Sequence, residues 1–314
     1  MKIRPSIEDV LWMATGAALL LICILVVLHF YKNQNPAAQL AFKARRVDLV
    51  GRMQFDLASA SESEKSAVLA ITDQDSQTFA DQARAASAKV EQERRELREL
   101  LTAGGTQGEK DLLTQFTEAF AEFQRIDNDL LALAVKNTNL KAYSLAFGPA
   151  ATALKEMNAA LSRLVAANAD SPKAKSTMLL AFGAQISALR IQTLLPPHIV
   201  EENDKKMDEL ETLMASEDAQ VLKNLDGLVA LPEFRNDPEL ATATAHYAEF
   251  SKIKMQILAL SRENTNVRSL SISLNQKRKV MLVCQATLST LQQAILAEPI
   301  AGVTYGTPVR PRRW

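Results

Sequence analysis

The stretch FAEFQRIDNDLLALAVKNTNLKAYSLAF, residues 120–147, returns as YAEFSKIKMQILALSRENTNVRSLSISL, residues 247–274. The two copies are offset by a constant 127 residues, and about 11 of their 28 positions are identical. Ungapped self-similarity of this kind indicates an internal repeat. Both copies contain LAL-x-x-x-NTN, which sets a polar Asn-Thr-Asn on an otherwise apolar helix face. The chain is therefore predicted to be a duplicated helical unit.

The composition favours long helices. The 314 residues are 47% hydrophobic, only 5% aromatic, and include just 10 glycines. The formal net charge is zero, so there is no electrostatic case for binding nucleic acid. Three widely separated histidines and two cysteines predict neither a metal site nor a disulfide framework. We expect no cofactor and no enzymatic activity, because no nucleotide-binding loop or nucleophile motif is present.

Residues 10–31 are predicted to cross a membrane. They carry no Asp, Glu, Lys or Arg, and about 20 such residues span the ~30 Å hydrocarbon core as a helix. A cleaved signal peptide is the alternative, but the apolar run is long for one and no clear cleavage site follows. Basic residues are more numerous after the segment, at Lys32, Lys43, Arg45 and Arg46, than before it. That count would place the following domain in the cytoplasm.

Four long helices are predicted after this segment, over residues 36–101, 109–168, 173–231 and 238–296. They are separated by the loop sequences AGGTQG, ANADSPK and LPEFRNDPE. Apolar residues recur at alternating steps of three and four, which is the pattern of a left-handed bundle. The predicted fold is all-α: a transmembrane helix followed by one long antiparallel up-down-up-down four-helix bundle over residues 36–297.

The predicted domain organisation follows from these elements. Residues 1–9 form a short N-terminal segment, and the bundle consists of a hairpin over 36–168 and its duplicate over 173–297. Residues 298–314 form a Pro/Arg-rich tail. The tail is expected to lie along the membrane surface or a neighbouring subunit, with disorder as the alternative.

A known family shares this organisation. The segments SASESEKSAVLAITDQDSQTFADQARAA (59–86) and LPPHIVEENDKKMDELETLM (195–214), together with both LAL-x-x-x-NTN blocks, resemble the sensor module of bacterial methyl-accepting chemotaxis receptors. The resemblance covers about residues 1–297 and implies a single-pass inner-membrane protein whose helical domain lies in the periplasm. It also implies a small ligand and a homodimer or another protein partner. The second membrane helix, HAMP linker and cytoplasmic signalling domain of a complete receptor are not recognised in this sequence.

The repeated polar residues are the candidate site. Asn137, Ser144, Asn264 and Ser271 fall on the predicted core seam, and Asn139, Asn266, Arg268 and His198 complete a candidate ligand-binding set. One interpretation is register control, since a buried Asn fixes the alignment of packed helices at a cost in stability. Register control predicts that leucine at 137 and 264 raises stability. The other interpretation is a polar chamber that binds a ligand or ordered water.

Further polar features lie elsewhere along the helices. Glu64 and Asp75 sit near the apolar stripe of the first helix, and a carboxylate there must be paired or hydrated. Candidate partners are Lys141, Arg190 and Arg268, although ordinary surface ion pairs are the alternative. Pro196 and Pro197 predict an interruption near the middle of the third helix, either a hinge or pocket that contains His198 or a rigid kink.

Two functions remain open from sequence alone. The chain is either a ligand sensor whose output passes through a partner, or a structural subunit that braces a larger membrane complex. A sensor predicts a pocket lined by the polar layers, whereas a scaffold predicts a dry core and an exposed apolar stripe. Both hypotheses include contact with membrane lipid through residues 10–31.

Overall fold

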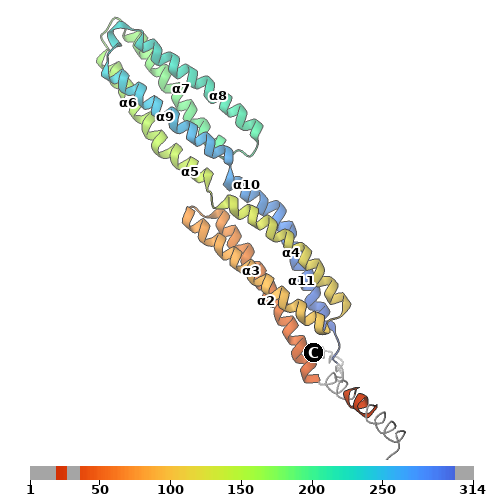
Figure 1. Ribbon diagram of the computed structural model, residues 1–314. Coiled ribbons are helices and arrows are strands. Elements are labelled where there is room, and N and C mark those ends of the chain that lie inside the picture. Colours follow the sequence, from red (N-terminus) through yellow and green to blue (C-terminus); the bar gives the residue numbers. More distant parts are fainter. Residues whose placement is uncertain (1–18, 27–35, 301–314) are drawn as a thin grey trace, which may run out of the picture. The chain divides into compact units, whose positions relative to one another are not determined.

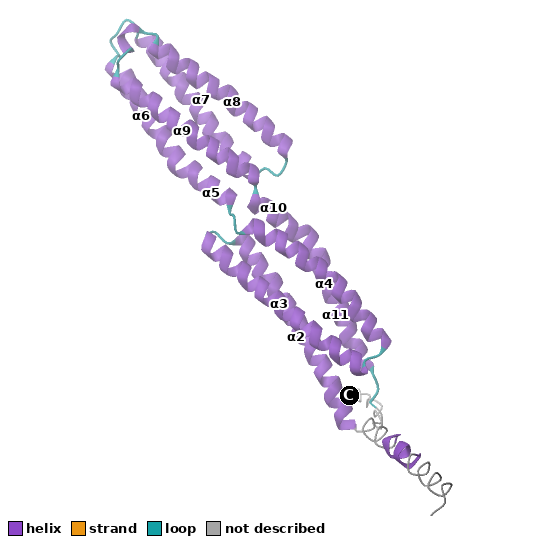
Figure 2. Cartoon of the chain, in the orientation of Figure 1, coloured by secondary structure: helices purple, strands orange, loops and turns teal. Residues whose placement is uncertain are grey.

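The computed structural model describes residues 19–26 and 36–300, and the regular elements in this part of the chain are all helices (Figure 2). The prediction of an all-α helical bundle is therefore confirmed. Residues 19–26 are helical with exposed apolar side chains. The rest of the predicted membrane helix, and the tail beyond residue 300, lie outside the described residues.

The predicted helix over 36–101 is two helices. Helix α2 runs over Pro36–Leu69 and α3 over Asp73–Gly104, and the chain turns back between them. Thr72 fixes this turn because its Oγ1 accepts a hydrogen bond from the backbone amide of Asp75 at 3.0 Å, as in a helix N-terminal capping box. The Ser76 hydroxyl adds a bond to the Ala67 carbonyl oxygen at 2.9 Å. The prediction of one continuous helix is wrong here.

The second predicted helix is divided at Asn137. Helix α4 spans Gln107–Ala134, and α5 (Thr138–Leu145), the π-helix η1 (Ala146–Ala150) and α6 (Ala151–Ala167) follow. Asn137 has φ 51°, a left-handed conformation that interrupts the helix and that Asn tolerates better than most residues.

The duplicate repeats this break 127 residues later. Helix α9 (Pro238–Glu263) ends at Asn264, which has φ 52°. Helix α10 (Thr265–Ile272), the π-helix η3 (Ser273–Lys277) and α11 (Arg278–Ala297) follow. Since η1 and η3 begin 127 residues apart, the repeat extends from the sequence to local backbone geometry.

The third predicted helix does not break at its prolines. Helix α7 (Ala174–Val200) continues through Pro196 and Pro197, and α8 (Asp204–Val229) begins after a turn at residues 201–203. The prolines deprive only the carbonyls of Gln192 and Thr193 of helical donors, near the end of the helix. Asn203 starts α8, because its side chain accepts hydrogen bonds from the amides of Lys205 and Lys206, two and three residues later. The short 3₁₀-helix η2 (Pro232–Phe234) then precedes α9.

The chain divides into two compact units. Unit 1 comprises residues 1–58, 86–120 and 282–314, and unit 2 comprises residues 59–85 and 121–281. In unit 2, helices α6, α7, α8 and α9 pack side by side as a four-helix bundle (Figure 1). Its core is built from Ala, Leu and Ile with Phe250 and Tyr247. Each fully buried Leu or Ile in such a core contributes about 1.5–3 kcal/mol.

A second core cluster of unit 2 joins the turn between α2 and α3 to the end of α4. Ala67, Val68, Ala80, Leu130 and Leu131 are buried there, and Ile272 of α10 packs against them. The fourth helix of this cluster thus comes from the second repeat.

Unit 1 contains parts of α2, α3, α4 and α11. Arg45 of α2 pairs with Glu96 of α3 at 3.3 Å, and Arg46 pairs with Glu109 of α4 at 2.8 Å. Lys43 donates to the carbonyl oxygen of Leu296 at the end of α11 at 2.6 Å. The end of α11 therefore lies beside the first turns of α2, as an antiparallel arrangement requires.

These contacts change the predicted bundle. Helices α5–α6 pack with α7 and α9, while α10–α11 pack with the helices of the first repeat. The hairpins predicted over 36–168 and 173–297 are therefore not separate packing units in the structure. Each repeat supplies three helices to one four-helix arrangement and its fourth helix to the other.

Two stretches of the described chain are long and apolar enough to cross a membrane: Ala174–Val200 and Pro238–Ala297. Both also contribute to the buried cores, through residues such as Ala184 and Ile191 of α7 and Ile257 of α9. Length and apolarity alone therefore do not separate them from core helices of a bundle.

Candidate functional site

The repeated Asn-Thr-Asn segments meet face to face. We call residues 137–139 and 264–266 the crossover. The Thr138 amide donates to Thr265 Oγ1 at 3.2 Å, and the Thr265 amide donates to Thr138 Oγ1 at 3.1 Å. The amides of Asn139 and Asn266 likewise donate to each other's Oδ1 atoms at 3.1 and 3.0 Å. The two segments therefore make the same hydrogen bonds to each other in both directions, as two segments related by a two-fold axis would.

The outer side-chain amides complete this network. Asn139 Nδ2 donates to Asn264 Oδ1 at 2.7 Å, and Asn266 Nδ2 donates to Asn137 Oδ1 at 2.9 Å. Asn137 Nδ2 reaches Asp73 Oδ1 at 3.1 Å, and Asn264 Nδ2 reaches the Glu201 carbonyl at 2.7 Å. Asn137 and Asn264 are buried and their amides bond within the protein, so the crossover joins the two repeats through satisfied polar groups.

The two seam serines lie elsewhere. Ser144 is exposed and Ser271 is only partly buried. Phe147 and Leu274, predicted on the same seam, have 65% and 57% of their surface exposed. The prediction that these residues face the core fails because the left-handed Asn rotates the following helix out of phase with the preceding one.

His198 lies next to the crossover and is fully buried at the end of α7. Its Nδ1 lies 2.8 Å from Ser261 Oγ, and its Nε2 lies 2.9 Å from Glu211 Oε1. Burial lowers the pKa of His198, although the neighbouring Glu211 opposes that shift. In the neutral form with the proton on Nε2, that nitrogen donates to Glu211, while the Ser261 hydroxyl lies beside Nδ1 and donates to the His198 carbonyl oxygen at 2.9 Å.

Glu211 is also bound by Arg262, whose Nε donates to it at 2.7 Å. The hydrogen bond from Arg262, and to a smaller extent the one from His198, holds the pKa of Glu211 below its usual value. The side chains of α7, α8 and α9 are thus joined in one network beside the crossover. Arg268 lies at its edge, 3.9 Å from Asp204 and half exposed. Of the predicted site set, the structure brings together the four asparagines and sets His198 beside them.

The basic residues predicted to pair with Glu64 or Asp75 form surface ion pairs with other carboxylates instead. Lys141 pairs with Asp73 at 3.0 Å, and Arg190 pairs with Glu217 at 3.0 Å. Asp75 is exposed and bonds to Thr72. Glu64 is the exception, because it is buried and none of the three candidate bases reaches it in the described contacts.

Glu64 instead belongs to a buried triad that sequence reasoning missed. Lys277 Nζ lies 3.4 Å from Glu64 Oε2, forms an ion pair with Asp127, and sits 4.4 Å from the centre of the Phe123 ring. The three charged side chains are at most 4% exposed. The triad joins η3 to α2 and α4 in the interior of unit 2.

A groove between α8 and α9 is a second feature that the sequence did not predict. It encloses about 410 Å³ and is walled by Leu222, Leu225 and Val229 on one side and by Ala248 and Met255 on the other. Hydroxyl groups of Thr244 and Ser251 and the carboxylates of Asp218 and Asp226 also line it. Its volume lies within the usual range for small-ligand sites.

Two residues that line this groove, Asp218 and Tyr247, belong to a polar network with Lys254. Asp218 Oδ1 accepts from Lys254 Nζ at 2.9 Å and also from the Tyr247 hydroxyl. Tyr247 and Lys254 are buried, whereas about a quarter of the Asp218 side chain is exposed. Burial, and then the bond to Asp218, raises the pKa of Tyr247. The helical spacing of apolar residues in the sequence carries no sign of this convergence of α8 with α9.

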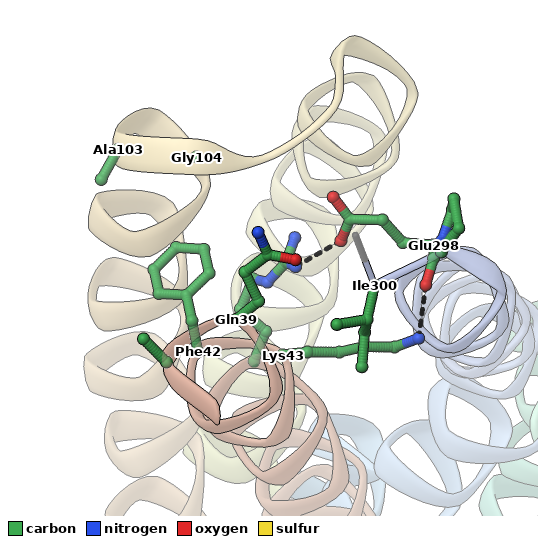
Figure 3. A pocket seen from close by; sticks show the side chains of 10 residues that line it. Gln39, Phe42, Lys43, Ala103, Gly104, Glu298 and Ile300 are labelled. Atoms are coloured by element: carbon green, nitrogen blue, oxygen red, sulfur yellow. Dashed lines mark hydrogen bonds and ion pairs between the residues drawn. The ribbon is translucent and has the colours of Figure 1, made fainter. Parts of the chain in front are cut away.

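A second cavity, of about 550 Å³, lies in unit 1 beside the ends of α2, α3 and α11 (Figure 3). The buried Arg46 borders it, paired with Glu109 and Glu298 and 4.8 Å from the Phe42 ring centre. Figure 3 shows Lys43 reaching the carbonyl of Glu298, 2.6 Å away. These bonds fasten the end of α11 to the beginning of α2, so the cavity is bordered by an ion-pair clasp.

The structure offers no further chemistry within residues 19–26 and 36–300. No group of three or more His, Cys, Asp or Glu in this part of the chain is arranged to hold a metal ion. Cys284 is buried, and burial raises the pKa of its thiol to about 12, which disfavours the reactive thiolate.

Comparison with known families points to one class of helical bundle for part of the chain. Residues 51–179 match the family described as the four helix bundle sensory module for signal transduction. The resemblance to a chemoreceptor-type sensor is therefore confirmed over these residues. No curated protein matches the chain.

Proposed function

We propose that this chain is a membrane-anchored sensory module that binds a small ligand in the groove between α8 and α9 and passes the signal to a partner. The helical domain lies in the periplasm, and the anchor at residues 10–31 holds it to the inner membrane. The module has no catalytic role. The groove carries the proposal, because it combines an apolar wall, convergent polar groups and a partly exposed carboxylate in one cavity of about 410 Å³.

The lining favours an organic ammonium ligand. Asp218 is already paired with Lys254, whereas Asp226 presents a carboxylate that makes no ion pair within the described residues, and Lys252 is the one cation among the residues that line the groove. The apolar rim of Leu222, Val229 and Met255 suits a short hydrocarbon body. An ammonium group near Asp226 would gain a charge-assisted hydrogen bond.

Titration of the full chain in nanodiscs with butylammonium tests this proposal, and butyrate serves as the probe of opposite charge. We expect saturable binding of butylammonium alone. Asp226→Asn should weaken it about tenfold, which corresponds to about 1.4 kcal/mol. Asp170→Asn, in the exposed loop between α6 and α7, is the matched control and should bind as the unchanged protein does. Equal uptake of both probes, or no effect of Asp226→Asn, would contradict the proposal.

One observation favours the alternative of a structural subunit. Helix α7 exposes a row of large apolar side chains at helical spacing, Leu179, Phe182, Ile186 and Leu189, each 45–64% exposed. Such a row marks a surface suited to protein contact. If the chain braces a complex, Phe182→Ser with Ile186→Ser should reduce the particle size in mild detergent without changing butylammonium binding.

A further inference from the structure

The two repeats align along their whole length and not only at the crossover. Buried positions of α2 reappear 127 residues later as buried positions of α7. These pairs are Val50 and Thr177, Leu57 and Ala184, Ala60 and Ser187, Glu64 and Ile191, and Val68 and Leu195. Helix α2 is therefore the first helix of one repeat, and α7 is the first helix of the next.

The family match covers one repeat. Residues 51–179 contain α2 from Gly51, then α3, α4 and α5–α6, before reaching the first residues of α7. A module described as a four-helix bundle thus corresponds to four consecutive helices of this chain. In the structure, however, α5–α6 pack with α7 and α9, and α10 packs with the first repeat. The fourth helices have changed places.

A helix exchange of this kind forms only if the exchanged arrangement is more stable than the arrangement without exchange. Two closely similar fourth helices compete for two closely similar three-helix groups. Each carries small residues on its buried face, at Ala142 and Ala146 in one and at Ser269 and Ser273 in the other. The next buried position differs, because it is Ala150 in α5–α6 and Lys277 in α10–α11.

The three-helix groups differ at the matching positions. The first repeat presents Glu64 and Asp127, both buried, and Lys277 pairs with both. The second repeat presents Ile191 and Lys254 at the equivalent positions, and Lys254 turns to Asp218 of α8. Without exchange, Ala150 would leave two buried carboxylates without a cation, and Lys277 would enter a site that already holds a lysine. Buried charges without a partner strongly disfavour a fold.

We propose that the Lys277–Glu64–Asp127 triad selects the exchanged arrangement of the two fourth helices. Only the first repeat offers buried carboxylates to Lys277, and the alanine at position 150 fits the second repeat. This role is independent of ligand binding in the α8–α9 groove. It assigns a specificity function to a buried ion cluster that the sensory proposal does not use.

Disulfide trapping distinguishes the two arrangements. In a background without Cys23 and Cys284, Arg163→Cys with Glu239→Cys reports the exchanged form, because Arg163 of α6 and Glu239 of α9 pair at 2.8 Å. Leu112 is the residue 127 positions before Glu239, so Arg163→Cys with Leu112→Cys reports the form without exchange. We expect the otherwise unchanged full chain in nanodiscs to form the first disulfide and not the second.

Moving the lysine should reverse this preference. Ala150→Lys with Lys277→Ala puts the cation on the other fourth helix, and we expect the Leu112 disulfide to increase at least tenfold. Lys279→Ala, an exposed change in α11 two residues after Lys277, should leave the pattern unchanged. If the double variant forms only the Glu239 disulfide, the proposal is overturned.

A neutral variant keeps the test decisive if the double variant does not fold. Lys277→Met with Glu64→Gln and Asp127→Leu removes all three charges, and apolar replacement of a buried ion cluster is commonly tolerated. We expect this variant to form the disulfide with each of the two cysteine pairs, which are introduced into separate proteins. Exclusive formation of the Glu239 disulfide would show that the crossover selects the exchange without the triad.

Discussion

The amide of Thr138 donates to Oγ1 of Thr265 at 3.2 Å, and the amide of Thr265 returns the bond to Thr138 at 3.1 Å. The two residues occupy the same position in the two repeats, and both are buried. Each threonine therefore satisfies the helix-starting amide of its duplicate, which would otherwise lack a partner at the N-terminus of α5 or α10. The junction therefore requires both copies of the repeated Asn-Thr-Asn segment.

The first prediction concerns Asn264. Leucine there loses the bonds to Glu201 and Asn139 and must adopt φ 52°, so we expect a loss of about 3 kcal/mol of unfolding free energy. Asn264→Gly keeps the backbone conformation and loses only the side-chain bonds, so its cost should be about half as large. Chemical denaturation measures both. A leucine variant more stable than the unchanged protein would contradict this prediction and support register control.

The second prediction concerns Glu93 in unit 1. Burial, and then the nearby carboxylate of Asp56, raises the pKa of Glu93 to about 7. A carboxyl whose pKa is higher in the folded state binds a proton there first, so stability declines as pH rises from about 4.5 through 7. Glu93→Gln should therefore raise stability at pH 8 by about 1–2 kcal/mol and have little effect at pH 5. Thermal unfolding at both pH values measures this, and an equal gain at both would contradict it.

The third prediction concerns the prolines of α7. The helix already continues through Pro196 and Pro197, and the turn after it is held by Asn203 and by Asn264. Pro196→Ala with Pro197→Ala should therefore leave the helix content nearly unchanged. The added amides can bond to Gln192 and Thr193, so the melting temperature should rise by a few degrees. A marked increase in helical circular dichroism would indicate that the prolines, and not the turn at 201–203, limit the helix.

Much of the fold could be predicted from the sequence because its loops carry glycine and proline. The segments around Gly104, Pro172 and Pro232 mark real helix ends. The turns at 70–72 and 201–203 contain neither residue. The available signals were the caps, namely Thr72 with Asp75 three positions later, and Asn203. On one continuous helix, Asp75 would fall on the apolar stripe. Because α2 ends at Leu69, Asp75 instead lies in the first turn of α3.

The site was harder to predict than the fold. The importance of Asn137 and Asn264 follows from the repeat, but their left-handed backbone does not, and it shifts every later seam position. The triad joins residues 64, 127 and 277, and the groove joins α8 to α9. Both depend on which helices are neighbours. Since the repeats are so similar, periodicity alone cannot tell an exchanged fourth helix from one that is not exchanged.

The last prediction concerns His198. Because burial lowers the pKa of this histidine, the folded protein holds it neutral and the unfolded chain takes up the proton first as pH falls. Stability contributed by the neutral ring is therefore present above pH 6.5, the unfolded value, and is lost as pH falls toward the lower folded pKa. The charged groups that face this network are Glu211 of α8 and Arg262 of α9.

His198→Gln removes this titration, so its unfolding free energy should fall less between pH 7 and pH 5 than that of the unchanged protein. The difference should be about 1.4 kcal/mol for each unit by which the pKa is lowered. His246→Gln, in the partly exposed outer face of α9, is the matched control and should follow the unchanged protein. Urea unfolding across this pH range measures all three. If the unchanged protein instead gains stability on acidification relative to His198→Gln, the ion pair with Glu211 outweighs burial, and the histidine is held protonated beside the crossover.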